Sequence, residues 1–249
     1  MKIGTCLAFM TATAIAMVSP AFAQGFSADQ REEIGKIVKE YLLAHPEVVQ
    51  EVMTEVEKHQ QAAEDQKHRA AVADNRATLF GSPHQVVLGN PQGSATIVEF
   101  FDYNCGYCKR AMSDMLDLLK NDNNLRFVLK EFPVLGEGSV EAARVAVAAR
   151  MQDPTGKKYL EFHQKLLGAR GAADKARALA VAKEVGFDMP RIEKDMNSDE
   201  AKKTIDENLK LADALGVNGT PSYVVGEEVV VGAVGLDSLR EKLAAERKQ

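Results

Sequence analysis

The sequence predicts an α/β domain that follows a long helical segment, and three observations support this prediction. Residues 27–80 show helical periodicity and contain no run that is typical of a strand. Residues 96–134 have the pattern of a strand, a helix and a second strand, and the chain ends with two short strands and a helix. Several helical stretches lie between these two parts. We therefore expect one sheet with an inserted helical block.

The first 23 residues have the pattern of a secretory signal peptide. Lys2 precedes an apolar run, and the small residues Ala21 and Ala23 form a cleavage site directly after it. The apolar run is short for a membrane span, so we expect cleavage after Ala23 rather than a membrane anchor. Export would place the mature chain in a compartment where disulfides form and persist.

Residues 24–80 predict an N-terminal helical segment. Ser27 and Gln30 fit a capping box at the start of its first helix. The pair His45-Pro46 ends this helix, because the residue before a proline is disfavoured in the helical conformation and proline suits the first turn of the next helix. The second helix is expected to run to the end of the segment.

A heptad pattern runs along this second helix, because apolar and small residues recur alternately three and four positions apart. The positions are Val49, Val52, Val56, His59, Ala63, Gln66, Ala70, Ala73, Ala77 and Phe80. An apolar stripe of this length needs to be buried, so we expect the helices to associate between copies of the chain. The alternative is a helix that folds back on its own domain. Any coiled coil should be weak at His59, Ala63 and Gln66.

The domain is expected to span residues 81–249, with its helical insertion at about 138–215, where glycines and prolines separate several helices. The expected strands are 85–90, 96–101, 125–134, 222–226 and 228–233, and further helices are expected at 109–120 and 236–248. The two strands of the β-α-β unit should be parallel. A β-α-β half and a β-β-α half together form a thioredoxin-type sheet.

The composition restricts the class of partner. The chain carries a formal net charge of −5, and removal of Lys2 with the signal peptide makes it more negative. This charge argues against nucleic acid as a partner.

Cys105 and Cys108 form a C-x-x-C pair at the expected start of a helix, and Cys6 leaves with the signal peptide. A structural zinc site needs four ligands, and the sequence contains no second C-x-x-C and no tight pair of histidines. A disulfide across so small a loop would restrain little of the unfolded chain. A redox pair fits better, because the N–H groups and the dipole at a helix start stabilise a thiolate.

The two cysteines are expected to differ in role. Cys105 would be the exposed nucleophile that forms a mixed disulfide, and Cys108, one turn further along, would be buried and resolve it. The residues between them, Gly106 and Tyr107, carry no positive charge. We therefore expect a milder oxidant than a protein with a protonated histidine at this position.

Two further features accompany the pair. Glu99 lies in an apolar strand, where a buried carboxylate would have a raised pKa and exchange a proton with Cys108. The alternative is a charge at a strand edge that faces water. Lys130, on the neighbouring strand, is a candidate charge partner of Glu99. Thr220-Pro221 directly precedes a strand, where a cis bond would expose the Thr220 backbone to an extended substrate.

Three stretches, IVEFFDYNCGYCKR, KEFPVLG and GVNGTPSY, resemble those of DsbA-like thioredoxin-fold proteins. The resemblance covers residues 84–248. It implies an active site that contains Glu99, Cys105 to Cys108 and a cis Thr220–Pro221 bond. The N-terminal stretch REEIGKIVKEYLLAHPEVVQEVM resembles the oligomerisation region of the suppressor-of-copper-sensitivity (ScsC) proteins.

These resemblances imply a periplasmic, oligomeric disulfide isomerase that acts on misfolded or disulfide-bonded exported proteins. A membrane-embedded thiol reductase would keep it reduced, and no cofactor or metal is expected. C-G-Y-C is also the motif of the disulfide isomerase DsbC, and the motif lacks the histidine of oxidase-type DsbA. The alternatives are a DsbA-type oxidase, a copper-tolerance protein that binds Cu(I) through both thiolates, and a chaperone-like holding protein.

Overall fold

The computed structural model describes residues 26–248, so the signal peptide expected at 1–23 lies outside the described residues. The described chain divides into two compact units between Lys58 and His59. Among residues 26–248, no helix combines the length and the apolar character that a membrane crossing requires.

The first unit contains α1 (Ala28–Ala44) and the beginning of α2 (Pro46–Asp74). The capping box is confirmed, because the Ser27 hydroxyl accepts from the Gln30 N–H and the Gln30 side chain accepts from the Ser27 N–H. His45 leaves the helical conformation, and Pro46 is the first residue of α2. The large apolar side chains here are exposed: Ile34, Ile37, Val38, Tyr41, Leu42, Leu43, Val49, Val52, Met53 and Val56.

The expected second helix is interrupted at Asn75, where the structure begins a short α3 (Arg76–Gly81). The Asn75 side chain donates to the Ala71 carbonyl at 2.9 Å, and its backbone angles depart from helical values. An asparagine that bonds to the preceding turn in this way competes with the regular helical pattern.

The end of α2 and all of α3 belong to the second unit. Val72 and Leu79 are fully buried, although neither is a position of the heptad pattern. The heptad positions Ala70, Ala73 and Ala77 are instead exposed. The compact unit therefore begins at residue 59 and includes residues 59–80, which the sequence analysis assigned to the N-terminal segment.

A five-stranded sheet forms the centre of the second unit. Its strands are β1 (Val86–Gly89), β2 (Ala95–Phe101), β3 (Leu125–Glu131), β4 (Ser222–Val225) and β5 (Glu228–Val231), in the order β1-β3-β2-β4-β5. As predicted, β2 and β3 are parallel; the other pairs are antiparallel. α4 (Gly106–Asn121) joins β2 to β3, and α10 (Leu236–Glu246) follows β5.

Alternation along β2 divides the core between the two faces of the sheet. Ile97 and Phe101 point to one face, where they pack in a cluster with buried side chains of α4 and α10. Val98 and Phe100 point to the other face, where they pack with Leu79.

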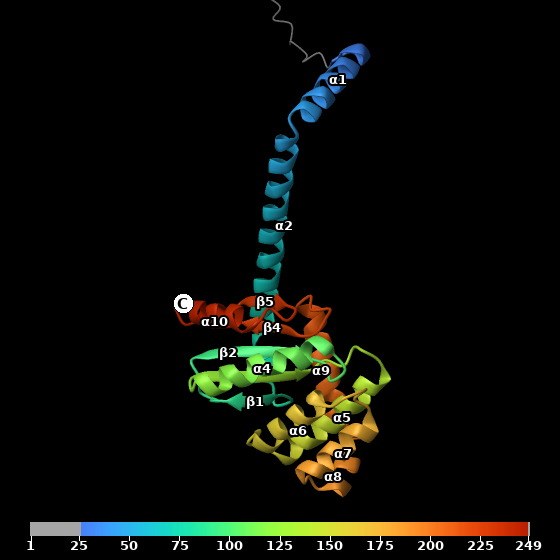
Figure 1. The fold of residues 1–249 in the computed structure, drawn as a ribbon, viewed down its shortest axis with the longest axis vertical. Helices are drawn as coiled ribbons and strands as arrows, with labels where there is room; N and C mark the ends of the chain where they lie inside the picture. The colour runs from blue at the N-terminus through green and yellow to red at the C-terminus, as the bar shows by residue number, and fades with distance from the viewer. Residues whose placement is uncertain (1–25, 249) are drawn as a thin grey trace, which may run out of the picture. The chain divides into compact units, whose positions relative to one another are not determined.

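The helical insertion consists of α5 (Glu137–Gln152), α6 (Lys157–Gly168), α7 (Lys175–Val185), α8 (Met189–Asp195) and α9 (Asp199–Ala214), close to the expected range. α5 to α8 gather beyond one end of the sheet (Figure 1). Asp174, Asp188 and Ser198 cap α7, α8 and α9 with their side chains.

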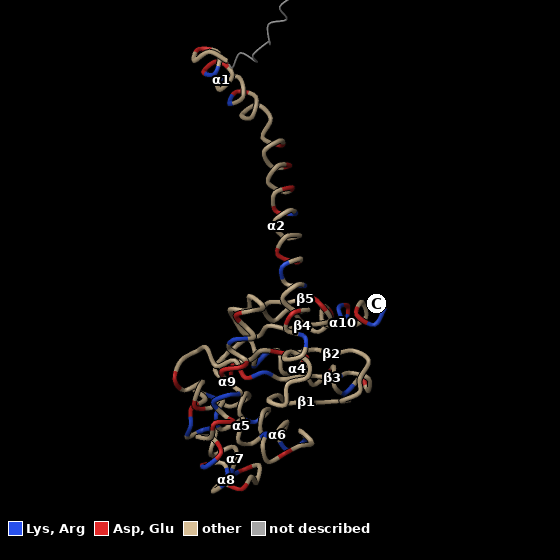
Figure 2. Tube along the Cα trace, turned by 180° about the vertical axis from the view of Figure 1, so that it is seen from behind, with Lys and Arg blue, Asp and Glu red and all other residues tan. Residues whose placement is uncertain are grey.

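Charged residues of both signs are interspersed along the described helices (Figure 2). The strands also contain three charged residues that are buried, namely Glu99, Lys130 and Glu131. Burying such groups costs free energy unless each has a partner or is neutral. The partners of Glu99 and Lys130, and the changes that burial makes to their pKa values, therefore bear on the site.

Candidate active site

The C-x-x-C pair opens α4, as the sequence predicted. Cys105 is the N-cap residue, and its Sγ accepts a hydrogen bond from the Cys108 N–H at 3.4 Å. The first N–H groups of a helix have no partner within the helix and carry its positive end. Cys105 therefore lies where backbone groups stabilise a negatively charged sulfur.

Cys105 is less accessible than the sequence analysis expected. Its residue is only 5% exposed, because the loop of Thr220 covers the sulfur and the Sγ–H donates to the Thr220 carbonyl at 3.1 Å. Cys108 is fully buried, as expected, and burial followed by the nearby Glu99 raises the pKa of its thiol. The two sulfurs thus have unequal surroundings.

The cis Thr220–Pro221 bond expected from the family resemblance is confirmed. Pro221 directly precedes β4, whose Ser222 is paired with Phe100 at the end of β2. The Pro221 carbonyl accepts from the Gly232 N–H at 2.9 Å, which ties this loop to the end of β5. The sheet therefore brings the loop against the start of α4.

Glu99 lies in the middle of the sheet and not at an edge. β2 has β3 on one side and β4 on the other, and Glu99 is paired with Tyr223. Burial raises the pKa of Glu99 to about 8, the charge of Asp114 adds to the rise, and the Tyr223 hydroxyl opposes it. The charge of Glu99 also contributes, after burial, to the raised pKa of the Cys108 thiol.

The structure does not bring Lys130 to Glu99. In the register of β2 and β3, Lys130 is opposite Phe100, so its side chain points to the other face of the sheet. There its Nζ donates to the Thr78 carbonyl in α3 at 2.9 Å. Burial lowers the pKa of Lys130 to about 8, and the charge of Glu207 opposes this change. Lys130 therefore anchors α3 to the sheet.

Gly106 and Tyr107 form the exposed first turn of α4. The Tyr107 side chain is 60% exposed, and the Arg110 guanidinium lies 4.3 Å from the centre of its ring. A cation in this position is attracted by the face of the ring. The first turn thus presents an aromatic surface beside Cys105.

Segments linked to Asp102 and to the cis-proline loop carry exposed apolar side chains, which the sequence analysis missed. Among the described residues from 59 onward, the exposed large apolar residues are Tyr107, Val134, Leu135, Val231 and Val234, here called the apolar rim. The N–H groups of Val134 and Leu135 donate to Asp102, three residues before Cys105. Val231 is paired with Ser222, next to Pro221. Apolar patches on a surface often mark interaction sites.

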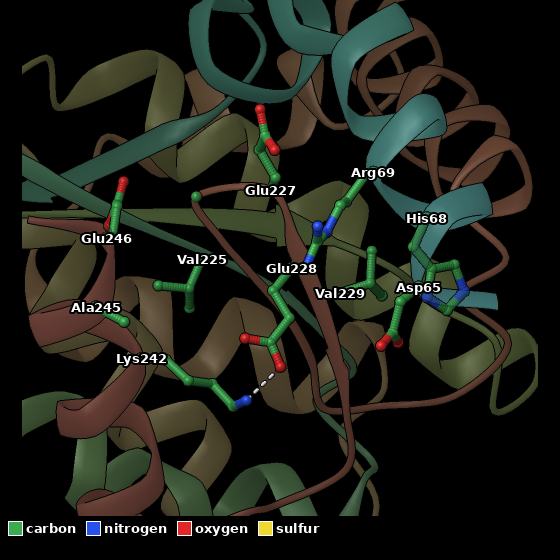
Figure 3. Close-up of a pocket in the computed structure, with 11 residues that line it drawn as sticks. Asp65, His68, Arg69, Val225, Glu227, Glu228, Val229, Lys242, Ala245 and Glu246 are labelled. Carbon is green, nitrogen blue, oxygen red and sulfur yellow. Dashed lines mark hydrogen bonds and ion pairs between the residues drawn. The ribbon is translucent and has the colours of Figure 1, made fainter. Parts of the chain in front are cut away.

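A pocket of about 490 Å³, drawn in Figure 3, is lined by residues that include neither cysteine of the pair. His68 and Arg69 of α2, Glu228 of β5 and Lys242 of α10 are among the residues that line it. It adjoins Val225, the end of β4 remote from Pro221. The pocket is therefore separate from the cysteine pair.

A C-x-x-C pair at a helix start, opposite a cis-proline loop on a β-α-β and β-β-α sheet, defines a thioredoxin-fold thiol–disulfide exchange protein. The chain belongs to the DSBA-like thioredoxin domain family, whose model matches residues 96–244. The model of the copper resistance protein ScsC N-terminal domain matches residues 30–63.

Solved structures agree with this assignment. A thioredoxin-like oxidoreductase from Silicibacter pomeroyi DSS-3 is 46% identical, and the match covers 70% of this chain and 99% of that one with a TM-score of 0.67. A linker-deletion mutant of Proteus mirabilis ScsC is 26% identical, and the match covers 90% and 98% with the same TM-score.

The first curated relatives are similar to this chain over only part of their own length. The Na(+)/H(+) antiporter NhaA 1 of Salinispora arenicola is 28% identical over 155 residues, which are 61% of this chain and 23% of the antiporter. The chain thus spans about a quarter of the length of the first curated relatives that it matches.

Proposed function

We propose that this protein is a periplasmic disulfide isomerase and reductase that acts on exported proteins through Cys105 and Cys108. The observation that carries the proposal is the asymmetry of the pair. Cys105 lies at the positive end of α4 against the cis-proline loop, whereas Cys108 is fully buried beside Glu99. Such a pair favours attack by the first sulfur and resolution by the second.

The reaction starts when the Cys105 thiolate attacks one sulfur of a client disulfide. A mixed disulfide forms, and the other client sulfur leaves as a thiolate. In isomerisation a different client thiolate then attacks the mixed disulfide, so Cys105 leaves unchanged. In reduction Cys108 attacks the Cys105 sulfur, the client leaves reduced, and the Cys105–Cys108 disulfide remains.

Glu99 is suited to exchange the proton of Cys108 in the second route. Its pKa of about 8 means that it binds and releases a proton near neutral pH. The carboxylate accepts the Cys108 proton as the thiol attacks, and it returns the proton when the pair is reduced again. Continued activity then requires two electrons from an external dithiol, for which we propose a membrane-embedded thiol reductase.

The apolar rim supports misfolded proteins as clients. Its five side chains are exposed, and they lie on the first turn of α4 or on segments linked to Asp102 and Pro221. Unfolded chains expose apolar segments that such a surface would bind. The Thr220 backbone lies beside Cys105 and provides groups for pairing with an extended client chain. Tyr107 adds no positive charge, which favours isomerisation over strong oxidation.

Association through the N-terminal helices would place several active sites near one client. The exposed apolar side chains of α1 and α2 and the match to the ScsC N-terminal domain support this part. Linked active sites raise the effective concentration of a second contact on the same client. The expected signal peptide supports the periplasmic location, and so does the similarity to the structure of a periplasmic thioredoxin-like protein from Salmonella enterica serovar Typhimurium.

Refolding of a scrambled, fully oxidised client protein tests the proposal. The reduced protein should restore the client's activity, and Cys105→Ser should abolish this effect. Cys108→Ser should retain part of the isomerisation, because that route needs only one sulfur. Rapid oxidation of a reduced client without rescue of the scrambled one would instead indicate an oxidase.

A further inference from the structure

The helical insertion holds the three residues that precede Cys105. Asp102, Tyr103 and Asn104 connect the end of β2 to the start of α4. Each side chain forms hydrogen bonds with residues more than 30 positions away. Connections between elements usually lie on the surface and are mobile, so the number of bonds here is unusual.

Asn104 pairs with the connection between α6 and α7. Its side-chain oxygen accepts from the Ala173 N–H at 2.7 Å, and its amide donates to the Ala173 carbonyl at 2.9 Å. The second amide proton is donated to the Ser139 hydroxyl of α5 at 2.9 Å. Both donors of the side chain are therefore used, and both bonds lead to the insertion.

Asp102 is held on the same side. Its Oδ1 accepts from the Ser139 hydroxyl at 2.7 Å and from the Asn104 N–H at 2.7 Å. Its Oδ2 accepts from the N–H groups of Val134 and Leu135 at 2.9 and 3.0 Å. The carboxylate thus joins the loop before Cys105 to the segment that leads into α5.

Tyr103 enters a buried polar cluster in the insertion. Its hydroxyl lies 3.3 Å from the Tyr159 hydroxyl and 3.3 Å from His163 Nδ1, both in α6. Tyr159 donates to Glu131 at 2.7 Å. Burial raises the pKa of Glu131 well above its usual value and lowers the pKa of His163 to about 3. With a pKa of about 3, the His163 ring is therefore neutral near pH 7.

Lys109, which directly follows the C-x-x-C motif, is also bonded to the helical insertion. Lys109 donates to the Ala169 carbonyl at 3.1 Å, at the end of α6. Ala169 and Ala173 both belong to the connection between α6 and α7. This connection therefore contacts the chain on both sides of Cys105.

We infer that Asn104 and Tyr103 are positioning residues through which the helical insertion sets the reactivity of Cys105. The Cys105 sulfur lies between an N–H donor, that of Cys108 at 3.4 Å, and the Thr220 carbonyl at 3.1 Å. An N–H group stabilises a thiolate, and a carbonyl oxygen destabilises it. A small shift of the loop therefore changes the stability of the Cys105 thiolate relative to the thiol. The inference rests on thiol–disulfide exchange at Cys105, whichever direction of exchange dominates.

Alkylation of Cys105 as a function of pH, together with equilibration against glutathione, tests this inference in the full-length protein. Asn104→Ala removes the three side-chain hydrogen bonds of Asn104, and Tyr103→Phe removes the hydroxyl that contacts Tyr159 and His163. Neither substitution adds charge. In both variants the midpoint of alkylation should move to higher pH. The disulfide form should become favoured by about 3- to 10-fold, in line with the loss of one interaction at a helix start. A tenfold change corresponds to about 30 mV.

Asn208→Ala is the matched control, and Ser139→Ala is the milder variant. The buried Asn208 amide donates to the Glu131 main-chain carbonyl at 3.0 Å and forms no hydrogen bond with the three loop residues. Asn208→Ala should lower the stability of the protein without changing the alkylation midpoint of Cys105 or the equilibrium with glutathione. Ser139→Ala removes only the hydroxyl that joins Asp102 and Asn104, and it provides the test if Asn104→Ala does not fold.

The outcomes separate this inference from the proposed function. Asn104 and Tyr103 would be merely structural if the folded variants differed from the wild type only in stability, as the control does. In that case the ionisation constant of Cys105 and the equilibrium constant with glutathione would both stay within twofold of the wild-type values. Equal and sluggish alkylation of both cysteines in the wild-type protein would instead overturn the thiol-exchange function itself.

Discussion

Replacing Glu99 with glutamine should make the stability of the reduced protein less dependent on pH. Glu99 is buried in the centre of the sheet, and its pKa rises from 4.5 to about 8 on folding. Between these values the folded protein keeps a proton that the unfolded chain releases. The free energy of unfolding therefore falls as the pH rises through this window, and this contribution is complete only below pH 4.5.

The size of the effect follows from the shift. One pKa unit corresponds to about 1.4 kcal/mol. Between pH 5.5 and 7.5 the wild-type protein should therefore lose about 2.5 kcal/mol relative to Glu99→Gln, because the glutamine has no proton to lose. Other groups that titrate in this range affect both proteins and cancel in the comparison.

Urea unfolding of the reduced proteins at several pH values measures this difference. Glu241→Gln, at an exposed position of α10, is the matched control, and its curve should follow that of the wild type. Curves for wild type and Glu99→Gln that stay parallel within about 1 kcal/mol would refute the reasoning, since Glu99 would then have an ordinary pKa.

Three further predictions concern other parts of the molecule. Leu79→Ala should cost about 2–5 kcal/mol in urea unfolding, because the side chain is fully buried against the sheet; a cost below 1 kcal/mol would show that α3 is not part of the core. Cys108→Ala should accumulate mixed disulfides with clients on non-reducing gels, whereas the single variant Cys105→Ala, which keeps Cys108, should not; mixed disulfides in Cys105→Ala instead would show that Cys108 is the nucleophile. Val52→Asp should shift light scattering toward the monomer and leave the melting temperature of the catalytic unit unchanged; an unchanged mass would exclude α2 from the interface.

Removal of residues 24–58 and removal of residues 24–80 should have different effects. The shorter deletion ends at the boundary of the compact unit and should yield a folded monomer. The longer one also removes Val72 and Leu79, which pack with Phe100 on one face of the sheet, and it should destabilise the catalytic unit. Circular dichroism and light scattering distinguish the two results.

The elements that depend on local pattern could be predicted from the sequence. The capping box of Ser27, the start of α2 at Pro46 and the opening of α4 at Cys105 depend on neighbours a few positions away. The break at Asn75 was missed, because an asparagine is tolerated in many helices and only the surrounding packing decides whether the helix continues.

Contacts between distant residues could not be predicted in the same way. Glu99 was expected to be buried or at an edge, and only the strand order places it at the centre. Lys130 was a candidate partner of Glu99. In the register of the two strands Glu99 is opposite Leu129, and Lys130, one residue further along, points to the other face of the sheet. The apolar rim combines residues of α4, of β5 and of two connecting segments, which are far apart in the sequence.

The sequence by itself determined the order of the elements, the C-x-x-C pair at a helix start and the family, because each of these depends on short stretches of chain. The tertiary structure alone decided that the Thr220 loop covers Cys105, that Val72 and Leu79 complete the core, and that the insertion holds the loop before the nucleophile. These contacts join residues tens of positions apart, and they form only when the sheet brings the segments together.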